Sequence, residues 1–215
     1  MIPGESPGLS PARLFFWRSY TVEERLRRTL ERIDEENMQD PTKESWEHGD
    51  MPSAWVYGQR MTAWLHKLTP EPSQELQIAA RAQHIRRWDV PRDTFPANRK
   101  GYLDWRVRMY DYHAEKALAI MQELGWDEDA QYQVNFYLHK RCLQTNREVQ
   151  FLEDCACLIF IQYQLLDIAR EHREQKVTRI IQKTWDKMTE QGHREVFAIG
   201  LPDEVHELLD KVMKV

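Results

Sequence analysis

The sequence predicts an all-α fold, a bundle of about seven to eight helices around one central apolar helix. Apolar residues recur at helical spacing along most of the chain after residue 20. Residues 149–169 are apolar almost all the way round, which is typical of a buried core helix. No segment shows a convincing strand pattern, and no internal repeat is visible.

The chain is expected to form one domain that follows a short tail. Its 215 residues, of which 41% are hydrophobic and 30% charged, suit a single globular domain. Residues 1–20 contain five Pro or Gly and are predicted to be a flexible tail. Residues 21–215 are predicted to be a single helical domain.

Charge and hydropathy exclude some classes of partner. The net charge of -5 argues against a protein that coats nucleic acid through bulk charge. No run approaches the roughly 20 apolar residues that a membrane span requires, and no secretory signal is visible. We therefore expect no membrane partner and a cytoplasmic location, with the nucleus as the alternative. The sequence leaves the oligomeric state open.

The first half of the chain predicts three helices. Thr21 and Glu24 match a capping box, so the first helix is expected to begin at Thr21. Residues 37–52 contain Pro, Gly and Asp and are predicted to be a long connection. A second helix follows Ser53. Ser73 can cap a third helix, and His84 is predicted to lie on its inward stripe.

The second half predicts the remaining helices. A fourth helix is expected from about residue 102 to 124, where Gly125 supplies a C-terminal cap. Asp127 can cap a fifth helix that ends near residue 140. The apolar helix comes next, a seventh covers about residues 177–188, and a last short helix follows Pro202.

Two acids lie within the apolar helix. Carboxylates such as those of Glu153 and Asp154 are costly in a core unless they are paired, hydrogen-bonded or bound to a metal. His84 and His113 are expected on or beside inward helical faces, and imidazole and carboxylate are common metal ligands. We expect His84, His113 and Asp154 to hold a divalent ion such as Mn, Zn, Mg or Fe. A buried ion pair with Lys or Arg is the alternative for the acids.

A basic segment precedes and enters the fourth predicted helix. Residues 81–108 contain eight Lys or Arg and only three acids, with aromatic residues between them. Arginines bind phosphate through bidentate hydrogen bonds, and aromatic rings can stack on a base. The alternative is that the arginine stems pack on the aromatic faces. The candidate substrate-binding residues are Arg86, Arg87, Trp88, Arg92, Arg106 and Lys140.

Five segments resemble one known family. They include Ala79-Ala-Arg-Ala-Gln-His-Ile-Arg-Arg-Trp88 and Leu152-Glu-Asp-Cys-Ala-Cys-Leu158. Shorter ones are Arg60-Met-Thr-Ala-Trp-Leu65, Gly101-Tyr-Leu-Asp-Trp-Arg106 and Lys183-Thr-Trp-Asp-Lys-Met188. Together they resemble the uncharacterised domain-of-unknown-function 4202 family from about residue 26 to 209. The resemblance implies no established activity.

The order of elements also looks like the HD superfamily of metal-dependent phosphohydrolases. There, His84 would take the place of the doublet His, His113 that of a following His, and Asp154 that of the closing Asp. Two positions depart from that pattern. Ile85 stands where the doublet Asp is expected, and no His lies near Tyr57, where the first His of that superfamily is expected.

Three functions follow as hypotheses. The first is an HD-like metal-dependent phosphohydrolase that acts on a phosphorylated small molecule or nucleotide, with His84 and Glu153 as catalytic residues. The second is an inactive HD-like module that binds RNA, a nucleotide or an acidic protein through residues 81–108, motivated by the missing Asp after His84. The third is an HD-like iron oxygenase.

Overall fold

The computed structural model describes residues 21–47 and 49–213, and within them it confirms the all-α class. The predicted tail, residues 1–20, lies outside the described residues. Two strands, β1 (Lys43–Trp46) and β2 (Gly49–Pro52), and two short 3-10 helices, η1 (Arg87–Asp89) and η2 (Arg92–Thr94), accompany the α-helices. The α-helices are α2 (Val22–Asn37), α3 (Ser53–Leu68), α4 (Gln74–Arg81), α5 (Arg99–Glu123), α6 (Glu128–Leu138), α7 (Arg147–Tyr163), α8 (Leu165–Glu171), α9 (Glu174–Trp185), α10 (Glu190–Ala198) and α11 (Asp203–Met213).

Side-chain caps start the helices where the sequence predicts them. The hydroxyl of Thr21 accepts a hydrogen bond from the backbone N–H of Glu24 at the start of α2. Ser73 and Asp127 cap α4 and α6 in the same way. Each cap satisfies a backbone donor that the first turn of a helix leaves unpaired. These three predicted helix starts are therefore confirmed.

Gly125 ends α5, also as predicted. Its φ of +73° is in the left-handed region, which a glycine adopts without steric cost. Its N–H donates to the carbonyl of Gln122, and the N–H of Trp126 donates to the carbonyl of Met121. These two bonds form a Schellman motif.

The connection at residues 37–52 is more ordered than predicted. It contains an antiparallel hairpin in which Lys43 pairs with Pro52 and Trp46 with Gly49. The strands are short and polar, so their sequence carries little strand signal. Tertiary contacts hold them instead: the Trp46 ring packs edge-on against Trp55 of α3 at 5.8 Å, and Glu44 pairs with Arg60.

Two helix boundaries and one additional helix also differ from the prediction. The third helix ends at Arg81 rather than near Pro91, and residues 82–86 form turns, so His84 is not on a helical stripe. The apolar segment is interrupted at Gln164, which separates α7 from α8. An additional helix, α10, is capped by Thr189 and was not predicted. The predicted count of seven to eight helices is therefore too low.

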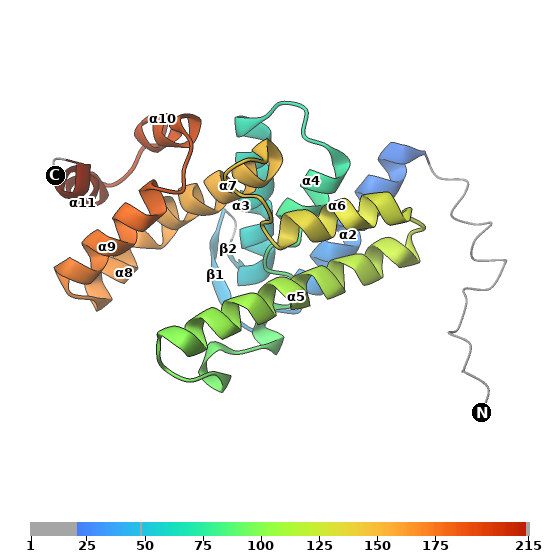
Figure 1. The fold of residues 1–215 in the computed structure, drawn as a ribbon, viewed down its shortest axis with the longest axis horizontal. Coiled ribbons are helices and arrows are strands. Elements are labelled where there is room, and N and C mark those ends of the chain that lie inside the picture. Colours follow the sequence, from blue (N-terminus) through green and yellow to red (C-terminus); the bar gives the residue numbers. More distant parts are fainter. Residues whose placement is uncertain (1–20, 48, 214–215) are drawn as a thin grey trace.

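The apolar helix α7 lies between two groups of helices (Figure 1). It packs on α3, α4 and α6 on one side and on α8 and α10 on the other. Ten of its residues are buried, including both acids. This arrangement confirms the prediction that one apolar helix crosses the core.

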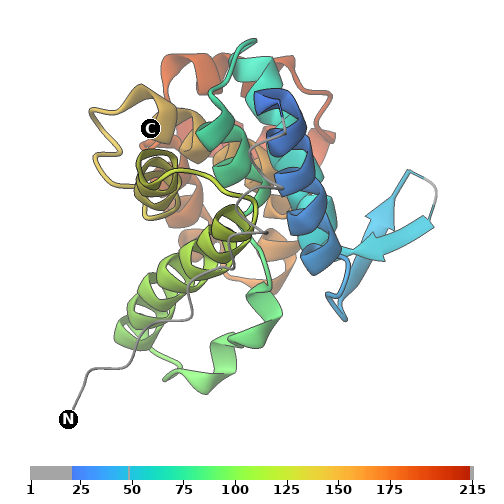
Figure 2. The same cartoon turned by 90° about the vertical axis from the view of Figure 1, so that its right-hand side faces the viewer.

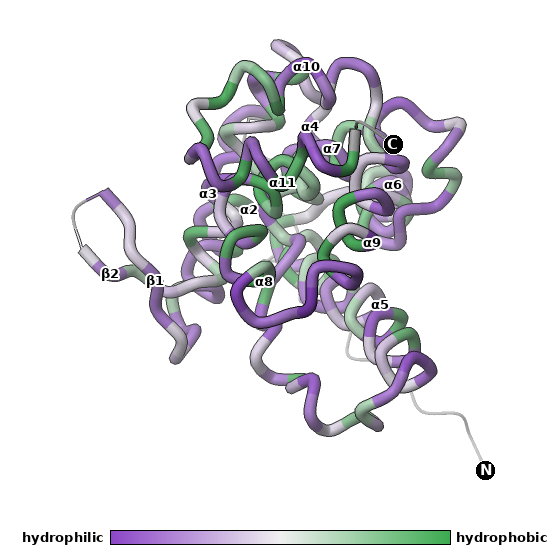
Figure 3. The backbone as a smooth tube through the Cα atoms, turned by 90° about the vertical axis from the view of Figure 1, so that its left-hand side faces the viewer, coloured by the Kyte–Doolittle hydropathy of each residue, from purple (hydrophilic) through white to green (hydrophobic). Residues whose placement is uncertain are grey.

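Two parts project from the helical body (Figure 2). One is the hairpin of β1 and β2, and the other is the first part of α5 together with the loop before it. Hydrophobic residues gather where the helices cross, whereas the hairpin and the loop before α5 are largely hydrophilic (Figure 3). Among the described residues, no helix has the length and apolar character that crossing a membrane would need.

Candidate functional site

A pocket of about 140 Å³ lies where α3, the turns after α4, η1, α5 and the turn after α6 meet. We call it the inner pocket. Its described lining contains three cationic residues and no acidic one. The lining residues are Tyr57, Gln83, His84, Arg87, Tyr102, Trp105, Arg106, Met109, Tyr110, His113 and Lys140.

Two arginines of the inner pocket have no ion-pair partner among the residues that the structure describes. The guanidinium of Arg87 lies 4.5 Å from the ring centre of Trp105. That of Arg106 lies over the ring of Tyr110 and donates a hydrogen bond to its hydroxyl. Burial lowers the pKa of Arg87, and the nearby charge of Arg106 lowers it further. Partly buried positive charge without an acidic partner favours an anionic ligand.

The third cation, Lys140, forms an ion pair with Glu153. Its ammonium lies 2.5 Å from Glu153 Oε2, and the other carboxylate oxygen pairs with Lys187 at 3.1 Å. Burial raises the pKa of Glu153, but the two lysines outweigh it and bring that pKa to about 2. Burial lowers the pKa of Lys140, and the carboxylate outweighs that effect as well. Both groups are therefore charged at neutral pH.

Two histidines line the inner pocket in their neutral form. Burial, and then the charges of Arg87 and Lys140, lower the pKa of His113 to about 3. The pKa of His84 is also far below its ordinary value, chiefly because of burial. The His84 ring stacks on Tyr57 at 3.5 Å. The Nε2 atom of His113 is buried and has no hydrogen-bond partner, so a ligand could bond to it.

Strained backbone marks two turns beside this pocket. Arg86 and Lys140 have φ of +49° and +51°, a left-handed conformation that costs a non-glycine residue about 1–2 kcal/mol. Lys140 occupies the position after α6 at which glycine usually stands, because its N–H and that of Arg141 close a Schellman motif on Tyr137 and Phe136. Strain of this kind is concentrated at functional sites.

A second pocket, of about 420 Å³, adjoins the first; we call it the outer pocket. The two pockets share Tyr57, His84, Arg87 and Trp105. Two acids lie on the outer side, together with the hydroxyl residues Thr42 and Ser53. The residues that line only the outer pocket are Asp40, Thr42, Glu44, Ser53, Ala54, Trp88, Val90, Pro91, Arg92 and Gln164.

Asp154 does not lie in this site. Its carboxylate accepts hydrogen bonds from the backbone N–H and the hydroxyl of Thr189, at 2.9 and 2.5 Å, and from Gln150 at 3.3 Å. Burial raises its pKa. Asp154 thus joins α7 to the start of α10, which is a structural role.

The donor set therefore does not fit the expected metal ion. The rings of His84 and His113 are 6.1 Å apart, but the nearby carboxylate of Glu153 is bonded to lysines and Asp154 to Thr189. No group of three or more His, Cys, Asp or Glu within residues 21–47 and 49–213 could hold a metal ion. The arrangement consequently supports neither the expected Mn, Zn, Mg or Fe site nor the two irons of an oxygenase.

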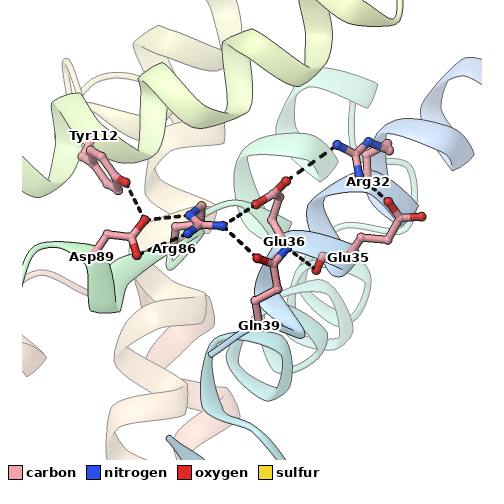
Figure 4. Close-up of polar contacts among 7 residues, drawn as sticks. All are labelled: Arg32, Glu35, Glu36, Gln39, Arg86, Asp89 and Tyr112. Carbon is pink, nitrogen blue, oxygen red and sulfur yellow. Dashed lines mark hydrogen bonds and ion pairs between the residues drawn. The ribbon is translucent and has the colours of Figure 1, made fainter. Parts of the chain in front are cut away.

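Arg86, expected to bind substrate, belongs to a separate network of charges (Figure 4). Its guanidinium bonds to Asp89 at 2.6 Å and to Glu36 of α2 at 2.8 Å, and Asp89 also accepts from Tyr112 of α5. Arg86 lines neither pocket. The network anchors the turn that carries Arg87, so Arg86 supports the site rather than forming it.

The other basic residues of 81–108 are dispersed. Arg81 is paired with Asp34, and Lys100 with Asp104. Arg92 donates to the carbonyls of Phe95 and Pro96 at 2.9 Å, although it lines the outer pocket with Trp88. Five of the arginines also lie over aromatic rings, as the packing alternative predicted. The segment is not one continuous basic surface.

The sequence predicted Arg87, Arg106, Lys140, His84 and His113 as site residues, and all five meet in the inner pocket. It did not predict five aromatic or amide residues of that lining. Helical spacing placed two of these on core stripes, and nothing local separates a core aromatic from one that lines a pocket. The residues that were not predicted are Tyr57, Gln83, Tyr102, Trp105 and Tyr110.

The comparisons with known proteins identify a family but no activity. The family described as a domain of unknown function (DUF4202) matches residues 27–209. No curated protein and no solved structure matches the chain. The HD resemblance thus gains no support from these comparisons, whereas the resemblance to the DUF4202 family is confirmed.

Proposed function

Because this chain belongs to the DUF4202 family, whose description assigns no activity, we propose a function from the site alone: the protein binds a phosphorylated small molecule or nucleotide in the inner pocket. One observation carries the proposal. Arg87 and Arg106 line a small pocket together, and neither has an acidic partner among the described residues.

Phosphate is the anion that best matches these groups. Two guanidinium groups and an ammonium together offer more donors than a carboxylate can accept, whereas a phosphoryl group has three terminal oxygens. The neutral His113 adds one ring nitrogen that lacks a partner. Glu153 offsets only part of the positive charge, because it is shared between Lys140 and Lys187.

Hydrolysis through a bound metal ion is not part of the proposal, because Asp154 bonds to Thr189 and does not lie in the pocket with His84 and His113. RNA binding is favoured by no specific observation, since Arg81, Arg86 and Lys100 are already paired with acids. The small volume of the pocket that Arg87 and Arg106 line, about 140 Å³, favours a small ligand over a polymer.

Titration calorimetry with inorganic phosphate and pyrophosphate tests the proposal. We expect binding that weakens as salt is added, because the attraction is between charges. Arg87→Gln or Arg106→Gln should each weaken it about tenfold or more, since a hydrogen bond to a charged group contributes about 1.5–3 kcal/mol.

Arg99→Gln is the matched control. Arg99 is an exposed arginine at the start of α5, and it lines neither pocket. This variant should bind phosphate as the unaltered protein does. Absence of phosphate binding at low salt in the unaltered protein, or an equal loss in Arg99→Gln, would contradict the proposal.

A further inference from the structure

Together the two pockets have the volume of a site for a ligand with two parts, a small charged group and a larger organic group. At about 30 Å³ for each water molecule, the inner pocket of about 140 Å³ holds four or five waters, which matches one phosphoryl group. The outer pocket of about 420 Å³ falls within the usual 300–1,000 Å³ of small-molecule sites. A ligand that lies across the shared residues His84 and Arg87 contacts both pockets.

The two pockets differ in their charged residues, because acids of the described chain line only the outer one. The inner lining carries Arg87, Arg106 and Lys140 and no acid among its described residues. The outer lining adds the acids Asp40 and Glu44 and one cation, Arg92, whose guanidinium donates to two backbone carbonyls. Both acids are held in place, Asp40 by the backbone N–H groups of Thr42 and Ala54 at 2.9 Å and Glu44 by Arg60 at 3.1 Å. Free lone pairs on fixed carboxylates accept hydrogen bonds from hydroxyl or amino groups.

The outer pocket also offers an aromatic surface. Trp88 lines only this pocket, and Trp105 lines both. The indole N–H of Trp105 donates to the carbonyl of Val90 at 2.9 Å, which fixes its ring. A planar ring of a ligand gains by stacking on such a face.

We infer that the ligand is a phosphate monoester whose single phosphate occupies the inner pocket and whose organic part occupies the outer one. That part is a ring-bearing group with hydroxyl or amino donors, as in a nucleoside or a sugar. The inference rests on the proposed function and narrows its ligand class. A polyphosphate fits poorly, because its additional phosphates would meet Asp40 and Glu44, whereas the guanidinium of Arg92 is already bonded to backbone carbonyls.

Calorimetry with four probes tests the inference: inorganic phosphate, ribose 5-phosphate, adenosine monophosphate and adenosine triphosphate. We expect the monophosphate to bind at least about tenfold more tightly than inorganic phosphate. The triphosphate should bind more weakly than the monophosphate. If ribose 5-phosphate binds as tightly as adenosine monophosphate, the ligand class is the sugar phosphates; if it binds more weakly, it is the nucleotides.

Variants of Trp88 separate the two pockets. Trp88→Ala should remove most of the gain of adenosine monophosphate over phosphate, so that the affinities of the variant for the two probes become nearly equal. Trp88→Phe keeps an aromatic face and should restore most of the gain, and thermal unfolding of both variants reports whether they fold.

Two results would overturn the inference. One is equal affinity for inorganic phosphate and both monoesters, and the other is a gain that Trp88→Ala leaves intact. In either case the binding of phosphate, and so the proposed function, would stand. If none of the four probes bound, the proposed function itself would fail.

Discussion

At the scale of single residues, Glu153 influences the charge of the inner pocket through its ion pair with Lys140. It is almost fully buried, and it pairs with Lys140, whose side chain is 14% exposed, and with the more exposed Lys187. A core helix tolerates this carboxylate because two ammonium groups replace the water it lost. The pair keeps Lys140 charged, and the strained turn places Lys140 in the pocket lining.

Glu153→Gln should therefore lower the stability of the fold while it strengthens the binding of phosphate. We expect the free energy of unfolding to fall by about 3 kcal/mol, because Lys140 would remain buried without its carboxylate. The affinity for inorganic phosphate should rise, because a bound phosphate would then be the anion that keeps Lys140 protonated, and the carboxylate would no longer compete with it for the ammonium. Urea unfolding and calorimetry measure the two effects.

Lys187→Ala provides the comparison for Glu153→Gln. The Lys187 side chain is 41% exposed, so losing its ion pair should cost less than about 1 kcal/mol. Equal losses of stability in the two variants, or weaker phosphate binding by Glu153→Gln, would show that Glu153 does not act as described.

At the scale of elements, Asp154 fastens α10 to α7. Thr189 caps α10 by accepting from the N–H of Gly192, and its own hydroxyl donates to Asp154. Gly192 leaves room for this contact, because a Cβ atom there would lie only 3.0 Å from the Asp154 carboxyl carbon. The acid that was expected to bind a metal thus joins two helices.

Thr189→Ala should loosen this contact. Loss of the cap should cost about 1–2 kcal/mol, and Asp154 would lose one of its hydrogen bonds in a buried position. Thr189→Ser keeps the hydroxyl and should cost little. Thermal unfolding of the two variants measures the difference, and an unfolding temperature of Thr189→Ala equal to that of Thr189→Ser would refute the role of the hydroxyl.

At the scale of the whole molecule, the neutral histidines of the inner pocket make stability depend on pH. The pKa of His113 is lowered to about 3, whereas in the unfolded chain it returns to about 6.5. Below pH 6.5 the unfolded state therefore binds a proton that the folded state excludes. Stability is fully present above pH 6.5 and falls as the pH drops toward 3, by about 1.4 kcal/mol per pH unit.

His113→Gln tests this dependence. Between pH 7 and pH 5, the unaltered protein should lose about 2 kcal/mol more stability than the variant. Glu153 does not obscure the comparison, because its pKa is lowered to about 2 and its contribution is lost only as the pH falls below about 4.5. Urea unfolding at the two pH values gives the measurement. Equal losses in the two proteins would mean that His113 is protonated in the folded state.

The sequence by itself determined most of the helices, their caps and the burial of both acids. Those features depend on local chemistry: Thr21, Ser73 and Asp127 cap the helix that each precedes, and apolar residues at helical spacing mark α7. The hairpin and α10 escaped prediction because distant contacts, such as that of Thr189 with Asp154, stabilise them.

Only the tertiary structure decided the partners of the charged groups. Glu153 and Asp154 are neighbours in one helix, yet one pairs with lysines beside the pocket and the other holds α10. The energy of a buried charge depends on which groups other elements bring within a few ångströms. Spacing along the chain contains no such distance, so it could identify the cations and histidines of the inner pocket but not that the residues described by the structure lack a metal ligand set.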